Sequence, residues 1–415
     1  MAATVDHDVA IVGAGMVGAV LACALAMQKQ RVLLIEDGEV PSPAVDGEPG
    51  LRVVTLSPAS CRMLERLGLW TPELAARAAS VARMDVWDDA RAAQRRIVFD
   101  AAELGQPALA QVVENDLVRG MALRHLQQQP NVTLAMPARL VGLTQHLNNA
   151  AITLADGREI RVSLVVGADG PRSPVRRLAG IGDNSRDYGQ RGLVANVRPR
   201  RAHRGTAWQR FLPTGPVALL PLFDGSYSIV WSTTPDHARE LEAMPEAAFV
   251  AALEAATEGV TGGFSASSQR AGFPLQMRFA DAFAARRVAL VGDAAHVVHP
   301  LAGQGANLGL LDAAALAESV RAGMARGDQP GEEPVLEHYA RWRKGHNLMV
   351  GATMDGFQRL FGDTHPLLAW LRGTGLATVD RMTPLKYSIM EHAMGLRGDL
   401  PPLAAVVADD GGSAA

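Results

Sequence analysis

The first 36 residues contain the pattern that most restricts how this chain can fold. An apolar strand, a glycine turn, an apolar helix and a second apolar strand follow one another, and the second strand ends in an acidic residue. These parts are, in order, 9–12, Gly13 with Gly15 and Gly18, 19–28, 31–35 and Glu36. The glycines would make the turn, let the backbone approach a diphosphate, and let the helix pack on the strand. The acid would accept hydrogen bonds from ribose hydroxyls, so the pattern predicts a Rossmann-like unit for FAD or NAD.

A second glycine-rich turn follows the apolar run 288–292, which is typical of a buried strand. The turn contains Pro300, Gly303 and Gly305, and an apolar helical stretch comes directly after it. Glycines that lead into a helix start expose N–H groups and a positive dipole end, which suit an anion. We therefore expect Asp293, at the end of the strand, to hold the ribityl chain of a flavin, and the helix start to face its isoalloxazine ring. A plain turn would explain Gly-Asp alone equally well, but not the whole run.

A third strand, 164–167, also ends in an acid–glycine turn, formed by Asp169 and Gly170. Two such turns in one chain suggest that two strand ends meet the same ligand crevice. Arg52 lies in a loop between two of these elements. A surface ion pair and a contact with the cofactor are equally good interpretations of this arginine.

Composition excludes several classes of protein. The 415 residues are 48% apolar and 20% charged, with a net charge of −3, which gives no electrostatic drive toward nucleic acid. Only two cysteines occur, far apart, so neither a disulfide framework nor a metal site is expected. The N-terminus lacks a secretory pattern, and no uninterrupted apolar stretch has the length of a membrane span. These features predict a cytoplasmic protein.

The order of patterns predicts an α/β fold in which a discontinuous Rossmann-like FAD-binding domain carries an inserted, mostly antiparallel sheet for substrate, followed by C-terminal helices. Leu193, Val217, Leu219 and Leu222 of that sheet would either line the substrate path or form core. The expected parts are the FAD-binding segments 1–80, 111–185 and 279–330, the substrate-side strands 81–110, the substrate sheet 186–278, the helical region 331–400 and a flexible tail 401–415.

Together these sites resemble the FAD-dependent aromatic hydroxylases, and within them the UbiH/UbiF/VisC/COQ family of ubiquinone-biosynthesis hydroxylases. The run from His299 to Asp312 fits the family signature at each fixed position. Further matches, which together with that run span nearly the whole chain, are Leu51-Arg52, Val113-Glu114-Asn115 and 393–396. The segments 99–104, 208–211 and 221–224 look most like the UbiF branch, whereas His299 is more like the UbiH and VisC branches.

The resemblance implies one bound FAD, with NAD(P)H as a transient co-substrate. The residues implied in holding FAD are Gly13, Gly15, Gly18, Glu36, Arg52, Gly292, Asp293, Pro300, Gly303, Gln304, Gly305, Ala306 and Asn307. Asp169 and Gly170 would serve both FAD and NAD(P)H, and Ser173 with Arg176 match later positions of the same motif. No catalytic side chain is identified, and His299 is a candidate by position only.

The implied reaction is hydroxylation of the ring of a polyprenylated phenol or quinol by O2, through a flavin C4a-hydroperoxide. Only one dinucleotide fingerprint is present, which favours a nicotinamide that binds, delivers hydride and leaves. A hydroxylase of a small soluble aromatic and a non-catalytic FAD-binding subunit of a biosynthetic complex stay open as alternatives. Contact with a membrane surface, membership of a complex of Ubi proteins and a homo-oligomer stay open as well.

Overall fold

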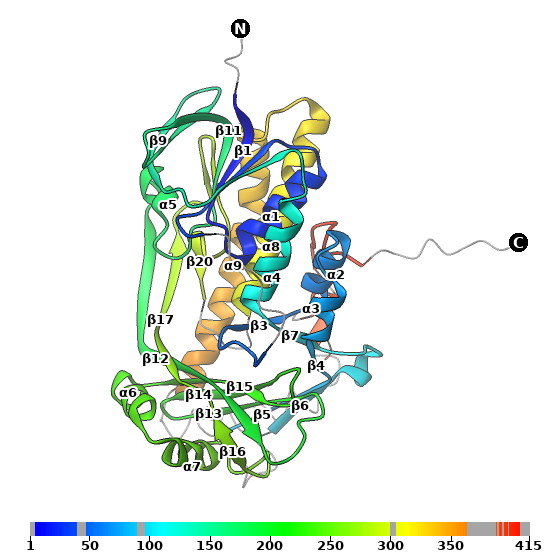
Figure 1. Ribbon diagram of the computed structural model, residues 1–415, viewed down its shortest axis with the longest axis vertical. Helices are drawn as coiled ribbons and strands as arrows, with labels where there is room; N and C mark the ends of the chain where they lie inside the picture. Colours follow the sequence, from blue (N-terminus) through cyan, green and yellow to red (C-terminus); the bar gives the residue numbers. More distant parts are fainter. Residues whose placement is uncertain are drawn as a thin grey trace, which may run out of the picture.

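The computed structural model describes residues 5–39, 47–88, 96–298, 304–362, 387, 390–391, 394–396 and 398–406. Within these ranges the strands form three sheets of eight, nine and three strands. The eight-stranded sheet and its helices occupy the upper half of Figure 1, and the nine-stranded sheet lies below them. The α/β fold class, with a Rossmann-like unit and a mostly antiparallel second sheet, is thereby confirmed.

The eight-stranded sheet is built around β1 (His7–Val12), which pairs in parallel with β2 (Val32–Ile35) on one side and β11 (Glu159–Gly167) on the other. β8 (Val132–Ala135) extends the parallel order beyond β2, and β19 (Val288–Leu290) extends it beyond β11. A short strand, β18 (Ala284–Ala285), pairs with β19. The hairpin of β9 (Leu140–Gln145) and β10 (Ala150–Leu154) branches from β11, through the Asp156-Gly157 turn.

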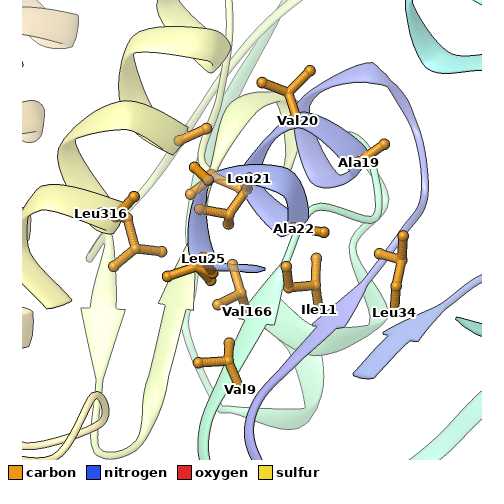
Figure 2. Packing of buried hydrophobic residues seen from close by; sticks show 14 of the residues in the cluster. Val9, Ile11, Ala19, Val20, Leu21, Ala22, Leu25, Leu34, Val166 and Leu316 are labelled. Carbon is orange, nitrogen blue, oxygen red and sulfur yellow. The ribbon is translucent and has the colours of Figure 1, made fainter. Parts of the chain in front are cut away.

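Helix α1 (Met16–Met27) packs directly on this sheet because almost all of its residues are apolar or small and ten of its twelve are buried. Figure 2 shows Leu21 and Leu25 of α1 among Val9 and Ile11 of β1 and Val166 of β11. A helix that is apolar all round must be covered on both faces. The second face is covered by α4 (Asn115–Leu126) and α8 (Gln304–Arg326), and α8 in turn packs on α9 (Glu333–Gly362).

The nine-stranded sheet has the order β20-β17-β12-β15-β14-β13-β5-β6, with β16 paired to β12. Two helices, α6 (Pro235–Ala243) and α7 (Glu246–Ala256), cover one face of it. The strands are β5 (Arg83–Trp87), β6 (Arg96–Asp100), β12 (Asp183–Pro199), β13 (Thr206–Leu212), β14 (Gly215–Pro221), β15 (Tyr227–Thr233), β16 (Phe264–Ser267), β17 (Ala271–Ala280) and β20 (His296–Val297). The short helix η2 (Ala101–Leu104) follows β6.

The structure decides between the two interpretations of the apolar residues in this sheet. Leu193, Val217 and Leu219 form a closed core with Phe249 and other residues beneath α6 and α7. Leu222 belongs to a smaller cluster with Ala79, Val81 and Val112. These residues are core, and a substrate path along them is wrong. The opposite face of the sheet, which contains Asn196, turns toward the FAD-binding half, since Asn196 Nδ2 donates to the Pro49 carbonyl at 2.7 Å.

The remaining strands form a small sheet that lies between the two halves. Its strands are β3 (Val53–Leu56), β4 (Ala79–Val81) and β7 (Ala110–Glu114). The short helix α2 (Pro58–Arg66) contacts β3 and β7, and α3 (Pro72–Ala76) contacts α4. Two further short elements, α5 (Pro174–Leu178) and η3 (Gly292–Ala294), lie elsewhere, against β11 and against α8. Ser57 caps α2 by accepting from the Ser60 N–H.

The C-terminal stretch returns to α2 and differs from the expected tail. Ala404 is fully buried, and the Arg62 guanidinium donates to its carbonyl at 3.0 Å. We predicted a flexible tail from residue 401, but 401–406 are held by these contacts. Residues 407–415 lie outside the described residues.

A buried polar network joins α8, α9 and the turn after β19. The fully buried Asp312 accepts from His296 Nε2 at 2.5 Å, from Arg343 Nε at 2.8 Å and from Asn347 Nδ2 at 2.9 Å. It also accepts from the Gly292 N–H at 3.1 Å. Burial alone would raise the pKa of Asp312, but His296 and Arg343 outweigh it and lower this pKa from 3.8 to about 2.

The network predicts that Asp312→Asn lowers stability by about 3 kcal/mol at pH 7, because Arg343 would remain buried without its anion. Since the folded-state pKa lies below the unfolded value, ionised Asp312 contributes stability that is present above pH 4 and lost as pH falls toward 2. The difference in free energy of unfolding between wild type and variant should therefore become smaller as pH falls from 5 to 3. Urea unfolding at each pH measures this difference.

Asp236→Asn is the matched control, because Asp236 pairs with Arg239 at the surface, where its side chain is 82% exposed. We expect its stability to stay within about 0.5 kcal/mol of wild type at every pH. If the stability difference between wild type and Asp312→Asn instead grew on acidification, Asp312 would not be ionised as assigned.

Candidate cofactor and active site

The carboxyl ends of four adjacent strands meet at one edge of the eight-stranded sheet. The parallel register pairs Val12 of β1 with Ile35 of β2 and with Gly167 of β11, and pairs Gly167 with Leu290 of β19. Each strand is followed within three residues by a predicted cofactor residue: Gly13, Glu36, Asp169 and Asp293. All four line one cavity of about 940 Å³, which is at the upper end of the range for ligand pockets.

The three fingerprint glycines have separate structural reasons. Gly13 has φ of +102°, and a Cβ there would lie 2.3 Å from the Ala168 carbonyl oxygen. At Gly18 a Cβ would lie 2.0 Å from the Gly13 carbonyl oxygen, so this glycine lets α1 close onto the turn. Gly15, in contrast, has no atom within 4 Å of a built Cβ and borders the cavity. Gly15 therefore keeps the cavity wall open, whereas Gly18 lies behind it.

The start of α1 offers unneutralised backbone donors to the cavity. Gly15 is the N-cap residue, no side chain caps the helix, and no acidic residue occurs in its first turn. Free N–H groups and the positive dipole end at such a terminus bind phosphate oxygens. This terminus is where the diphosphate of a dinucleotide would fit.

Glu36 stands at the end of β2, beside the first turn. Its Oε2 accepts from the Ala14 N–H at 2.7 Å. The guanidinium of Arg119, on α4, lies 3.7 Å from the same oxygen, and Arg119 Nε donates to the Ala14 carbonyl at 2.6 Å. The carboxylate is thus held at the cavity wall with its other oxygen available for ribose hydroxyls.

Asp169 and Gly170 form the turn after β11, and both line the cavity. Asp169 Oδ2 accepts from the Val175 N–H at 2.9 Å, which fastens the turn to α5. Its Oδ1 is buried and has no protein partner. Burial raises the pKa of Asp169, and the hydroxyl of Ser173 together with the Val175 N–H partly offsets this rise. An orphaned buried acceptor of this kind fits a bound hydroxyl or amide donor.

Asp293 follows β19 and borders the cavity on the side of β11 that faces away from β1. Its side chain is accessible from the cavity, but protein packed on its other sides raises its pKa, with a partial offset from His296 and Arg52. The preceding Gly292 does not line the cavity. Gly292 has φ of +58° and donates its N–H to Asp312, so it shapes the turn that presents Asp293.

The start of α8 places Gly305 and Ala306 in the cavity wall. Asn307 points elsewhere: its Nδ2 donates to the Thr55 carbonyl, and its Oδ1 accepts from the Ser57 N–H and the Ser60 hydroxyl. Its side chain therefore anchors α8 to β3 and α2 and leaves only backbone for a cofactor. The backbone of Gln304 begins α8. The predicted residues His299, Pro300 and Gly303 lie outside the described residues.

Arginines of the cavity wall were not singled out from the sequence, apart from Arg52. The others are Arg119, Arg139 and Arg177. Arg119 could have been found, because it lies one helical turn after Asn115 of the Val113-Glu114-Asn115 segment and so on the same face. Four cations, an orphaned carboxylate oxygen and an uncapped helix start fit the phosphates and hydroxyls of FAD.

Comparison with known proteins agrees with this geometry. Residues 6–346 match the family described as FAD binding domain. The chain is 37% identical to the 3-demethoxyubiquinol 3-hydroxylase of Escherichia coli over 94% of its own length and 98% of that protein. It is 39% identical to the ubiquinone hydroxylase UbiL of Rhodospirillum rubrum, over 94% and 89%. The chain belongs to the FAD-dependent hydroxylases of ubiquinone biosynthesis.

The family assignment confirms the resemblance found in the sequence, the enzyme class and FAD as the cofactor. A eukaryotic member, the mitochondrial ubiquinone biosynthesis monooxygenase COQ6 of Xenopus tropicalis, is 35% identical over 93% of both chains. The two bacterial relatives are similar to this chain to nearly the same degree. Placement in the UbiF branch therefore stays a prediction.

Solved structures share the fold. The p-nitrophenol 4-monooxygenase PnpA of Pseudomonas putida superposes with a TM-score of 0.76 at 20% identity, over 95% of this chain and 99% of that one. PqsL of Pseudomonas aeruginosa, a probable FAD-dependent monooxygenase, gives 0.73 at 25% identity, over 89% and 99%. Within the described ranges, every helix is either too short or too polar to span a lipid bilayer.

The different positions of Gly15 and Gly18 predict different defects. Gly15→Ala places a methyl group at the cavity wall without a clash, so we expect the variant to fold. The substitution should lower the free energy of unfolding by at most about 1 kcal/mol. Its affinity for FAD should fall at least roughly tenfold, because the methyl group keeps the diphosphate from the backbone. Flavin fluorescence quenching measures the affinity, and thermal unfolding of the apoprotein measures stability.

Gly18→Ala should instead destabilise the apoprotein by several kcal/mol or prevent its folding, because its Cβ would overlap the Gly13 carbonyl. Equal loss of apoprotein stability in both variants would show that Gly15 is a packing residue and would remove it from the cofactor site.

Proposed function

We propose that the protein hydroxylates the aromatic ring of a polyprenylated phenol or quinol, with FAD bound in the cavity at the carboxyl ends of β1, β2, β11 and β19. NAD(P)H is the transient reductant and O2 the oxygen donor. The observation that carries the proposal is that the fingerprint turn, both acid–glycine turns and the start of α8 line one cavity. Bound FAD supplies the hydride-accepting and oxygen-activating chemistry of the reaction.

In this proposal the chain binds and orients the cofactor along the cavity. The start of α1, with Gly15, faces the diphosphate, and Glu36 accepts from the ribose hydroxyls of the adenosine. Asp293 accepts from the ribityl hydroxyls, and Asp169 serves the same middle region through its orphaned oxygen. Ionised carboxylates only accept hydrogen bonds, so they suit the O–H donors of a sugar or a ribityl chain.

The start of α8 supplies electrostatic stabilisation. Gly305 and Ala306 open a 23-residue helix whose first turn contains no acidic residue. Its positive dipole end and free N–H groups would stabilise negative charge that develops in the ring system during reduction. Arg52 adds a full positive charge to the same cavity.

The substrate would lie against the face of the nine-stranded sheet that turns away from α6 and α7. Val194, Ala218 and Val230 alternate with the core residues in the strand register, so they lie on the same face as Asn196. Their side chains are only partly buried. A small apolar surface on the face of the sheet that turns toward the FAD-binding half suits an aromatic ring with a hydrocarbon tail.

A polyprenylated substrate is lipid-soluble, so the enzyme must meet it at a membrane surface or receive it from a partner. We propose that the protein works at the cytoplasmic face of the membrane as a peripheral protein, alone or within a complex of biosynthetic proteins. Cosedimentation with liposomes that contain the prenylated phenol tests this step, and we expect more bound protein than with liposomes that lack it.

The reaction itself is tested by following flavin absorbance anaerobically after NAD(P)H is added, with and without a polyprenylated phenol. We expect the phenol to accelerate bleaching, and the same phenol without its prenyl tail to be at least roughly tenfold less effective, because remote binding energy is used to orient the ring. When the reaction is run under oxygen-18 gas in place of air, mass spectrometry should find one labelled oxygen on the ring.

Each other outcome points to a different function. Equal acceleration by the simple phenol would favour a hydroxylase of small soluble aromatics. Flavin that binds but does not bleach under any of these conditions would favour a non-catalytic FAD-binding subunit. Unlabelled product in oxygen-18 gas would exclude a monooxygenase.

A further inference from the structure

The residues that lead to Arg52 are gripped by side chains from three separate elements. Arg77, at the end of α3, donates from Nη1 to the Gly47 carbonyl at 3.2 Å and from Nη2 to the Glu48 carbonyl at 3.5 Å. Glu114, at the end of β7, accepts from the Gly50 N–H at 2.7 Å. The segment 47–50 is thus fixed through its backbone.

Arg77 and Glu114 also bind each other. Arg77 Nε donates to Glu114 Oε2 at 2.6 Å and Nη2 to Oε1 at 3.0 Å, a two-pronged ion pair whose side chains are 6% and 11% exposed. Such a buried pair is rarely the cheapest way to stabilise a fold, because both charges must leave water. A pair that also holds a neighbouring backbone segment has a reason beyond stability.

The substrate sheet supplies further contacts to segment 47–50 and to Arg77. Asn196 of β12 donates from Nδ2 to the Pro49 carbonyl at 2.7 Å and more weakly to the Gly50 carbonyl at 3.4 Å. The ring of Phe223, which follows β14, lies 4.2 Å from the Arg77 guanidinium carbon. The segment 47–50 is therefore clamped between the FAD-binding half and the substrate sheet.

The clamp acts on Arg52 through the backbone. Arg52 follows the clamped segment after one residue, and its carbonyl accepts from the Asn115 N–H at 2.9 Å. Val53, the next residue, pairs with Glu114 itself in the β3–β7 ladder. The Arg52 side chain borders the cofactor cavity, close enough to Asp293 to lower its pKa against the effect of burial. Glu114 therefore fixes the chain on both sides of Arg52.

We propose that Arg77, Glu114 and Asn196 are positioning residues that hold segment 47–50 so that Arg52 meets FAD. These three residues affect FAD binding through the position of Arg52, and not through the overall stability of the fold. The inference rests on FAD occupying the cavity, and it does not depend on which aromatic substrate is hydroxylated.

The test is a double-mutant cycle on FAD affinity, measured by flavin fluorescence quenching on the full chain. Glu114→Gln and Arg52→Ala should each weaken FAD binding by roughly tenfold, and Glu114→Gln should add less than about twofold in the Arg52→Ala background. Asn196→Ala removes the grip from the other side of the segment and keeps the buried ion pair intact. It should weaken binding by roughly fivefold alone and have almost no effect in the same background.

Glu258→Gln is the matched control, because Glu258, in the turn after α7, pairs with Arg210 of β13 at 2.9 Å. Their side chains are 23% and 16% exposed, and neither contacts segment 47–50 in the described hydrogen bonds. This variant should leave FAD affinity within about twofold of wild type. If Glu114→Gln does not fold, the Asn196→Ala and Arg52→Ala cycle decides alone.

Losses that simply multiply in the double variants would show that the clamp residues do not act through Arg52 and would overturn the inference. Unchanged FAD affinity in both Glu114→Gln and Asn196→Ala would do the same. Wild-type protein that binds no FAD in this titration would refute the proposed cofactor placement itself, which is a different failure.

Discussion

Parallel pairing of β1 with β2 on one side and β11 on the other is the constraint on which the rest of the molecule depends. The register brings the ends of these strands and of β19 to one edge, where Gly13, Glu36, Asp169 and Asp293 follow them. The backbone ladders gather these residues, which are far apart in the chain, because they fix the register of each strand to within a residue. The helices then complete the site, since α1 and α8 begin where the strands end.

The parts of the site that follow strand ends could be predicted because each is a local pattern with a physical reason. Glycines after a strand, an acid after the next strand and acid–glycine turns occur within a few residues of one another. Convergence of the turns followed from the general behaviour of parallel sheets. Arg139 and Arg177 could not be found in this way, because arginine is common at surfaces and nothing local distinguishes one that lines a cavity.

The sequence could not predict which face of the substrate sheet packs on helices, for a different reason. Alternation along β12 and β14 separates two faces; α6 and α7 cover one of them completely, and the other turns toward the FAD-binding half and is only partly buried. A pattern of period two says that two faces exist and not which partner covers each. The apolar appearance of Leu193 and Val217 favoured neither interpretation, and packing under α7 decided it. Asn307 illustrates the same limit, since its side chain bonds to β3 and α2 although its backbone opens α8.

Charge in the cavity wall limits how FAD can lie there. Arg52, Arg119, Arg139 and Arg177 are accompanied by acids that include Glu36, Asp169 and Asp293, so the wall carries little net charge. A diphosphate is therefore attracted less by the sum of side chains than by the uncapped start of α1. The carboxylates would repel phosphate oxygens but accept hydroxyls, so the sugar and ribityl parts must face them. In the proposed placement, the order of acids and helix starts along the wall would give the cofactor one direction, with its ring end at α8 and Arg52.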